Sequence, residues 1–414
     1  MRILMLTQFY PPYIGGEERH VRNLSLRLKE RGHSVAVATL GNSDLPAYAE
    51  EDGVRIYRMH GSMQRFAGLF SESSRRHAPP FPDPELTLAL RKIVQQERPE
   101  IVHAHNWLVH SYLPLKAMSA APLVLTVHDH SIVCPKKKLI YGENLCSGPE
   151  ARKCAGCAGR HYGPLKGFSV LGMHRATTAL ELPMIDLFVP VSRATGEDNK
   201  LFNGKLPVEV IPNFVPDDIG NVDAQPHELL AQLPDEPFIM FAGAFGRYKG
   251  LDVLIDAYRM LQNAVPLVII GYYTPEYPIR TKDFPPNVYV LRDWPHNAVM
   301  QAWQRCLFGV VPSTWSEPCP TVAMEAMACG RALIGTSLGG ITDLIDDGES
   351  GLLVPPDNVP ALAQAMRALM DDRERCARMG EAGKAKVVHF QAQTVIERIE
   401  HAYGQLVGSR PDGR

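Results

Sequence analysis

The stretch that decides the fold is MRILMLTQFYPPYIGGEERHVRNLSLRLKERGHSVAVATL, residues 1–40. Its residues 2–8 form an apolar run, which is typical of a strand buried on both faces of a sheet. Residues 17–31 carry apolar side chains at helical spacing, and Gly32 follows as a helix-ending residue. Residues 34–40 are a second apolar run, so the stretch predicts a strand, a helix and another buried strand.

The same alternation continues along the chain and then starts afresh. Further apolar runs, separated by helical segments, lie at 54–59, 100–104, 122–127 and 186–191. A stretch rich in Pro and Asp, residues 212–237, is typical of a linker. Beyond it, strands are expected at 238–243, 266–271, 287–291, 307–312 and 331–336, and a helical segment at 381–408. The pattern predicts an α/β fold with two doubly wound parallel sheets.

Two Rossmann-like domains are expected, because 414 residues are too many for one ordinary domain. Residues 1–207 form the N-terminal domain in this prediction, and residues 208–385 form the C-terminal domain. Residues 386–414 are predicted to be a C-terminal helix and tail that packs back on the N-terminal domain.

The composition narrows the class of protein. Hydrophobic residues make up 45% and charged residues 21%, as in soluble globular enzymes, and a net charge of -2 indicates no nucleic-acid partner. The opening apolar run meets Pro11-Pro12 at once and lacks the features of a signal peptide. We therefore expect a cytoplasmic protein, with peripheral contact at the inner membrane face left open.

Two glutamates frame a predicted helix start in SEPCPTVAMEAMACG. Pro320 blocks helix before it, so Glu317 lies in a loop and Glu325 in the following helix. The free N–H groups of that helix, at Thr321 and Val322, suit an anion or sugar hydroxyls. Glu325 suits the hydroxyls of a ribose. Taken alone, solvated glutamates near a helix start are the more ordinary interpretation.

A glycine turn, FAGAFGRYKG at residues 241–250, follows the first strand of the second half. Arg247 and Lys249 lie at the carboxyl end of that strand, where α/β sheets bind ligands, and two cations suit a diphosphate. The turn matches neither the P-loop pattern nor the dinucleotide pattern. The alternative is a turn with two surface cations.

Two features lie at the corresponding edge of the first predicted sheet. Gly15 and Gly16 precede a helix start, where backbone can approach a ligand closely. His128, in TVHD, ends a buried strand and faces the same edge. A plain strand-to-helix turn and a structural histidine are the alternatives.

Together these motifs resemble glycosyltransferase family 4, the retaining glycosyltransferases with the GT-B fold. The resemblance covers almost the whole chain, from PPYIGGE and KERGHSV through VHAH and LTVHD to EPCPTVAMEAMACG and GGITDLIDDGESGLLVPP. It implies two Rossmann-like domains facing a central cleft. It also implies transfer of a hexose from a nucleoside diphosphate sugar to a hydroxyl of a glycan or lipid-linked acceptor.

The resemblance implies how the donor diphosphate is held. Gly16 would place its amide against the diphosphate, and Arg247 and Lys249 would hold it. The family often has Arg where this chain has Ala244, and Arg247 would supply that charge. No Asp-x-Asp metal motif occurs in the sequence, so we expect catalysis without a metal or other cofactor.

The resemblance also implies how the rest of the donor is bound. His128 would contact the donor sugar, Glu317 its hydroxyls, and Glu325 the ribose. Pro320 stands where the family often has Gly, which removes one backbone donor. The predicted catalytic residues are His128, Arg247, Lys249 and Glu317. The predicted donor-binding residues are Gly15, Gly16, Gly243, Arg247, Lys249, Glu317, Cys319, Thr321, Val322 and Glu325.

Half of the eight cysteines are clustered after His128, and they are Cys134, Cys146, Cys154 and Cys157. A Cys-x-x-Cys pair is a usual zinc half-site, and a reducing compartment argues against disulfides. The clustering favours a structural zinc over the alternative of four free thiols.

Other functions remain open at this point. A sugar-nucleotide epimerase or a phosphorylase would use the same fold, although no site for a phosphorylase's cofactor lysine is found. A non-catalytic, metal-stapled binding protein is the alternative from another class. Intact His128, Lys249, Glu317 and Glu325 favour the transferase.

Overall fold

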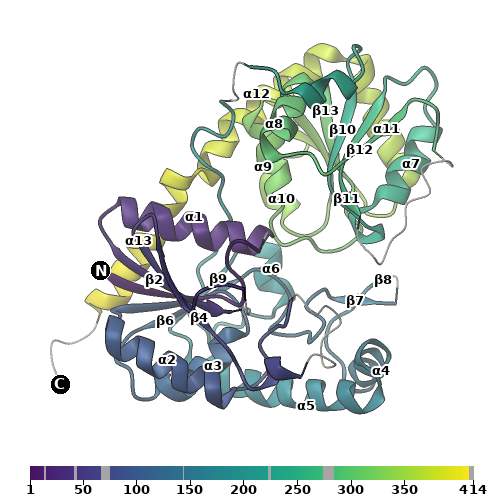
Figure 1. Ribbon diagram of the computed structural model, residues 1–414. Coiled ribbons are helices and arrows are strands. Elements are labelled where there is room, and N and C mark those ends of the chain that lie inside the picture. The colour runs from purple at the N-terminus through teal and green to yellow at the C-terminus, as the bar shows by residue number, and fades with distance from the viewer. Residues whose placement is uncertain are drawn as a thin grey trace. The chain divides into compact units, whose positions relative to one another are not determined.

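The computed structural model describes residues 1–13, 15–41, 44–66, 75–142, 144–221, 225–273 and 284–409. The chain packs into two compact units, which are Met1–Pro212 with Ile396–Arg414, and Asn213–Val395 (Figure 1). The predicted limits at 207 and 385 fall short of the unit limits at 212 and 395. Within the described residues, no helix is long and apolar enough to cross a membrane.

The sheet of the first unit has the strand order β3-β4-β2-β1-β5-β6-β9 over the described residues. The strands are β1 (Arg2–Leu6), β2 (Ser34–Leu40), β3 (Tyr48–Glu51), β4 (Val54–Met59), β5 (Ile101–Ala104), β6 (Leu123–Val127) and β9 (Leu187–Pro190). Neighbours pair in parallel, except that β3 runs antiparallel to β4. Without β3, this is the doubly wound order, in which ligands bind at the carboxyl ends of the strands.

Helices cover both faces of this sheet, with α2 and α3 on one face and α1 on the other (Figure 1). The helices of the unit are α1 (Gly16–Glu30), α2 (Pro84–Glu97), α3 (Leu108–Lys116), α4 (Ala151–Tyr162), α5 (Pro164–Glu181), α6 (Arg193–Asp198) and most of α13 (Ala392–Gly408). A two-stranded hairpin, β7 (Ile140–Tyr141) and β8 (Asn144–Leu145), lies before α4.

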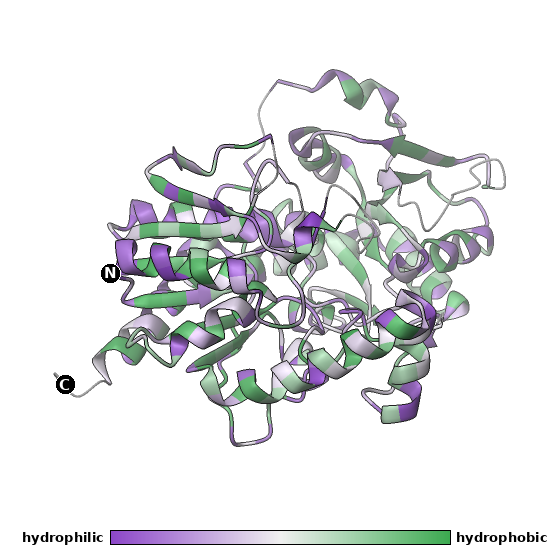
Figure 2. Cartoon of the chain, turned by 60° about the horizontal axis from the view of Figure 1, so that its bottom comes forward, coloured by the Kyte–Doolittle hydropathy of each residue, from purple (hydrophilic) through white to green (hydrophobic). Residues whose placement is uncertain are grey.

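Alternate side chains of the strands enter separate cores. Leu4 and Leu6 of β1 lie in one apolar cluster with Leu86 of α2 and Tyr112 of α3. Because successive strand residues point to opposite faces, Met5 is buried on the side of α1. Figure 2 shows hydrophobic stretches along the strands, whereas the helices alternate between hydrophobic and hydrophilic stretches.

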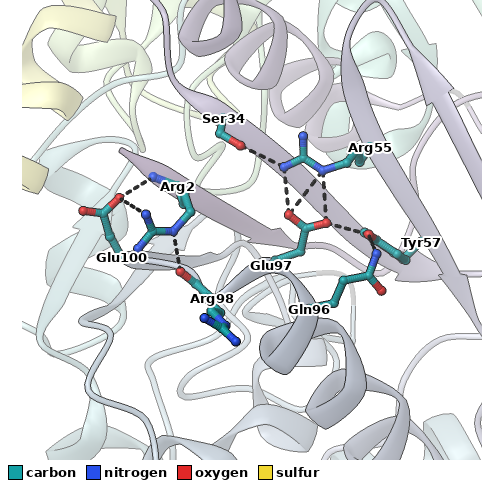
Figure 3. Close-up of polar contacts among 8 residues, drawn as sticks. All are labelled: Arg2, Ser34, Arg55, Tyr57, Gln96, Glu97, Arg98 and Glu100. Carbon is teal, nitrogen blue, oxygen red and sulfur yellow. Dashed lines mark hydrogen bonds and ion pairs between the residues drawn. The ribbon is translucent and has the colours of Figure 1, made fainter.

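A polar network ties the last turn of α2 to the amino-terminal edge of this sheet (Figure 3). Glu97 accepts hydrogen bonds from Arg55 and Tyr57, and Arg55 also donates to Ser34 Oγ at 2.9 Å. Although burial acts against it, these bonds hold the pKa of Glu97 below its usual value. The network therefore stabilises the edge opposite the predicted site.

The second unit repeats the doubly wound order as β12-β11-β10-β13-β14-β15, with parallel pairs throughout its described strands. These strands are β10 (Ile239–Phe245), β11 (Leu267–Tyr273), β12 (Val288–Arg292), β13 (Phe308–Val311), β14 (Ala332–Thr336) and β15 (Gly351–Val354). The helices are α7 (Leu251–Arg259), α8 (His296–Arg305), α9 (Thr321–Ala328), α10 (Ile341–Leu344), α11 (Val359–Asp371) and α12 (Arg373–Val387). The two sheets are thus duplicates in topology.

The predicted helical segment at 381–408 is interrupted. Helix α12 ends at Val387, a 3-10 turn covers Val388–Phe390, and α13 begins at Ala392. Val215 N donates to Phe390 O at 3.0 Å, and Ala392 N donates to Val215 O at 2.9 Å. These backbone groups bond to a segment distant in sequence, so they are not available to a continuous helix.

Candidate active site

A glycine allows the turn after β10 to lie against the end of β13. Residues Arg247–Lys249 form a 3-10 turn, and Gly250 follows with φ 73°, in the left-handed region. A Cβ at Gly250 would lie 1.8 Å from the carbonyl oxygen of Pro312, just beyond β13. Only glycine fits this close approach, which brings the predicted cations to the loop that carries Glu317.

Lys249 and Glu317, predicted from separate motifs, form an ion pair. Ser313 Oγ donates to the other carboxylate oxygen of Glu317 at 2.5 Å. The Glu317 side chain is buried, and its carbonyl accepts from Gly340 N at 2.6 Å. The carboxylate is therefore held in one place by a cation and a hydroxyl, at the carboxyl edge of the second sheet.

Arg247 and Gly243 lie on either side of the strand end. Arg247 is exposed, on the same 3-10 turn as Lys249. The predicted strand at 238–243 is too short, because β10 continues to Phe245. Gly243 is therefore inside the strand rather than in the turn, with φ 152°. Its carbonyl oxygen would lie 1.8 Å from a Cβ at Gly271, so the two glycines bring β10 and β11 into close contact.

Helix α9 begins where the sequence predicts, directly after Pro320, which is extended at φ -74° and ψ 106°. The amides of Thr321 and Val322 belong to its first turn, where N–H groups have no acceptor within the helix. Cys319 is buried, and its carbonyl accepts from Asn213 Nδ2 at 3.4 Å. Burial raises the pKa of the Cys319 thiol to about 12, so this cysteine is no nucleophile at neutral pH.

Glu325 is buried on α9 and has a partner that the motifs do not include. Its Oε1 lies 2.9 Å from His296 Nε2, at the start of α8. His296 carries no motif of its own. The available signal was its position directly after Trp294-Pro295, where a helix start is expected.

In the first unit, the predicted glycines begin α1. Gly15 is the residue before the helix, and a Cβ there would lie 2.1 Å from Glu18 Oε2. Gly16 is exposed, and a Cβ there would meet nothing within 4 Å. The first amides of α1 therefore border open space, as an anion site at a helix start requires.

His128 follows β6 and belongs to a histidine cluster. Its Nε2 lies 3.1 Å from His105 Nδ1, and its ring centroid lies 4.9 Å from that of His20 on α1. Burial lowers the pKa of His20 to about 4 and that of His103, on β5, to about 3. Burial also lowers the pKa of His105 well below its usual value. At neutral pH these three imidazoles are therefore uncharged.

Glu17, a carboxyl group at the same edge, belongs to none of the roles predicted from the sequence. Its Oε1 accepts a hydrogen bond from Asn106 Nδ2, and Thr7 Oγ1 lies 3.4 Å away. Burial raises the pKa of Glu17 to about 8, although Lys137 acts in the opposite direction. Glu17 therefore holds its proton at neutral pH more often than an ordinary carboxyl group.

Two family models match the chain in succession. The model described as Glycosyltransferase Family 4 matches residues 14–219, and the model described as Glycosyl transferases group 1 matches residues 227–386. An uncharacterised glycosyltransferase of Methanocaldococcus jannaschii is 31% identical, over 98% of this chain and 99% of its own. The chain belongs to glycosyltransferase family 4. A glycogen synthase of Mycobacterium tuberculosis is 27% identical to this glycosyltransferase, over 97% of the chain and 94% of its own.

Solved structures of similar proteins agree on the fold of this glycosyltransferase. Sucrose-phosphate synthase from Thermosynechococcus elongatus has a TM-score of 0.75 and 20% identity, with 99% of each chain covered. HepE of Anabaena, solved in complex with UDP, has a TM-score of 0.68 and 18% identity, with 98% of this chain and 100% of HepE covered. The two α/β units are therefore those of the GT-B fold, as predicted.

One pocket of the glycosyltransferase is separate from the predicted residues. It has a volume of about 630 Å³ and is lined by residues between Pro226 and Phe238, with Arg305. None of the predicted site residues lines it. The volume of a pocket therefore does not by itself point to the charged groups at the strand ends, where α/β sheets bind ligands.

Proposed function

We propose that this glycosyltransferase moves a hexose from a nucleoside diphosphate sugar to a hydroxyl of a glycan or lipid-linked acceptor, with retention of configuration. The ion pair of Lys249 and Glu317 beside the start of α9 is the observation that carries the proposal. A diphosphate needs cations and backbone N–H groups, and sugar hydroxyls need a fixed carboxylate. The second unit places these groups together at one strand edge.

Donor binding requires the pair to exchange partners. Lys249 would turn from Glu317 to the diphosphate, and the carboxylate of Glu317 would then accept hydroxyl protons of the sugar. Glu325 would accept from the ribose in the same way, in place of His296. A nucleotide donor is supported by HepE of Anabaena, a protein of the same fold that was solved with UDP and with UDP-glucose.

We also propose that the reaction needs no divalent cation. A leaving diphosphate carries about two to three negative charges that must be offset as the sugar bond breaks. Arg247 and Lys249 would supply positive charge for this purpose. The acceptor oxygen would attack from the face that the diphosphate leaves, and the diphosphate would take the acceptor's proton.

Calorimetry on the whole chain tests the donor assignment directly. Free UDP, GDP, ADP and dTDP, and then their hexose conjugates, are titrated into the wild type and into the Lys249→Ala variant. We expect one base to bind clearly and the variant to bind that nucleotide at least tenfold more weakly, as for a lost charge-assisted contact. The absence of binding by every nucleotide to folded protein contradicts the proposal.

Activity assays test the remaining parts. With the donor identified, release of nucleoside diphosphate is followed in excess EDTA, and the anomeric configuration of the product is determined by NMR. We expect undiminished turnover and a retained anomer. Loss of turnover that magnesium or manganese restores, with the fold intact, contradicts metal independence. An inverted product contradicts same-face attack. Conversion of the donor without release of diphosphate indicates an epimerase instead.

A further inference from the structure

Four cysteines of the first unit surround one small cavity that lies apart from the residues proposed to bind the donor. The cavity has a volume of about 20 Å³, and its lining includes Cys134, Cys146, Cys154 and Cys157. Such a volume admits a single particle about as large as a water molecule. Three segments supply these cysteines, which are the turn at Cys134, the end of the β7–β8 hairpin at Cys146, and helix α4.

The turn around Cys134 directs backbone N–H groups at its sulfur. Cys134 N donates to His130 O at 2.9 Å, and Lys137 N donates to Cys134 O at 2.9 Å. The amides of Lys136 and Leu139 donate to the sulfur. Amide donors of this kind stabilise a thiolate that binds a metal.

Cys154 and Cys157 lie one turn apart on α4 and share a face of that helix. Glu150 N donates to Cys154 Sγ at 3.3 Å, and Lys136 Nζ lies 3.5 Å from Cys157 Sγ. The start of the helix and the ammonium group of Lys136 both place positive charge near these sulfurs. Cys146 completes the set, and its N–H donates to Leu139 O at 2.8 Å.

The segment that carries the cysteines has little apolar material to hold it. Among the described residues from 134 to 162, the buried apolar side chains are Pro135, Leu139 and Ala158. A short segment with so small a core needs a covalent or metal staple to be ordered. The cysteines are all free thiols, so disulfides do not provide that staple here.

We propose that Cys134, Cys146, Cys154 and Cys157 bind one structural zinc ion as thiolates. Among the described residues, His20, His105 and His128 form the group of three whose potential ligand atoms all lie within 4.8 Å of one another, and no three of the four cysteine sulfurs meet that limit. The cysteine sulfurs are therefore more widely spaced, and the metal would draw them inward to zinc–sulfur bonds of about 2.3 Å. Four thiolates leave no open position, so this zinc takes no part in glycosyl transfer.

Elemental analysis of the full chain, purified without a metal-affinity step, tests the site. We expect about one zinc per chain, as for a structural site. The Cys154→Ser, Cys157→Ser double variant should lose at least nine-tenths of it. Cys329→Ser in the second unit and His20→Gln in the histidine cluster are the matched controls, and both should keep it.

X-ray absorption at the zinc edge separates the cysteine site from the histidine cluster. Four sulfur neighbours at about 2.3 Å in the wild type support the proposal even if the double variant does not fold. A zinc content below a tenth per chain overturns it. Zinc that stays in the double variant, zinc that leaves with His20→Gln, or a coordination shell of nitrogen and oxygen overturns it as well.

Discussion

The ammonium group of Lys249 forms an ion pair with the buried carboxylate of Glu317. Replacing it with alanine would remove the cation proposed to offset the leaving diphosphate and would leave Glu317 without its ionic partner. We predict that Lys249→Ala lowers kcat/KM by roughly a hundredfold, the range for lost transition-state charge stabilisation. Steady-state kinetics of folded variant against wild type measures this change.

Two further variants calibrate that measurement. Arg259→Ala changes an exposed cation on α7, and it should leave kcat/KM unchanged. Arg247→Ala tests whether Arg247 supplies the positive charge that the family often has at the position of Ala244. A loss of less than fivefold in Lys249→Ala would place Lys249 away from the leaving group.

The pairing of Lys249 with Glu317 could be predicted only in part from the sequence. Both residues follow buried strands, and parallel strands bring their carboxyl ends to one edge. The ion pair itself depends on the left-handed turn at Gly250, and no periodicity in the sequence encodes that contact. The contact of His296 with Glu325 joins two helix starts that are distant in sequence, so neither motif indicates it.

Glu17 gives a second prediction at the residue scale, on stability. Its pKa is about 8 in the folded unit and about 4.5 in the unfolded chain, so the folded form keeps a proton that the unfolded form loses. The carboxyl group's contribution to stability therefore falls as pH rises from about 4.5 to about 8. Glu17→Gln removes this penalty.

We expect the Tm of Glu17→Gln to exceed that of the wild type at pH 8 and to approach it at pH 5. For a unit of this size, Tm should rise by roughly 2–4 °C for each kcal/mol that the substitution adds to the free energy of unfolding. Glu30→Gln, an exposed position on the same helix, is the control and should show no such trend. A difference in Tm that is the same at both pH values argues against a raised pKa at Glu17.

At the scale of elements, the junction of β10 and α7 depends on one glycine. A Cβ at Gly250 would meet the Pro312 carbonyl at 1.8 Å, in addition to the cost of a positive φ. Gly348 also has a positive φ, 81°, but a Cβ there would meet nothing within 4 Å. We predict that Gly348→Ala costs about 1 kcal/mol, the cost of the left-handed backbone alone.

Gly250→Ala should cost at least about 1 kcal/mol more than Gly348→Ala, because backbone must move to relieve the overlap. Urea denaturation of both variants compares the two costs within one unit of the protein. Equal costs would show that the turn can shift away from β13 without strain.

The elements that the sequence predicted correctly are those with a continuous apolar run. Strands β1, β2 and β10 are buried on both faces, so their composition alone indicates them. Strand β3, with the sequence YAEE, is exposed and antiparallel at the sheet edge, and it lacks that signal. Strand β15 is four residues long and follows a glycine turn, so it resembles a loop.

At the scale of the whole molecule, the two units differ in their buried titratable groups. In the first unit, His20, His103 and His105 are buried and uncharged. In the described part of the second unit, the pKa values that burial shifts belong to Tyr258 and to four cysteines, and these are raised. Acid is therefore expected to act through the buried histidines of the first unit.

The sign of the acid effect follows from the histidines. The pKa of His20 is about 4 in the folded unit and about 6.5 in the unfolded chain, so the unfolded chain binds protons more readily between these values. The contribution of His20 to the stability of the first unit should therefore fall as pH drops from about 6.5 to about 4, opposite in sign to the contribution of Glu17. Among the described residues of the second unit, those with shifted pKa values are a tyrosine and four cysteines, so no corresponding effect of acid is expected from them.

We predict that lowering the pH from 7 to 5 reduces the protection of β1, β5 and β6 against hydrogen exchange more than that of β10, β13 and β14. Mass spectrometry of exchanged peptides, corrected for the pH dependence of intrinsic exchange, compares the units within one sample. His20→Gln removes one of the groups that must be protonated and should weaken the pH dependence of the first unit alone. Equal loss of protection in both units would mean that another set of groups controls acid stability.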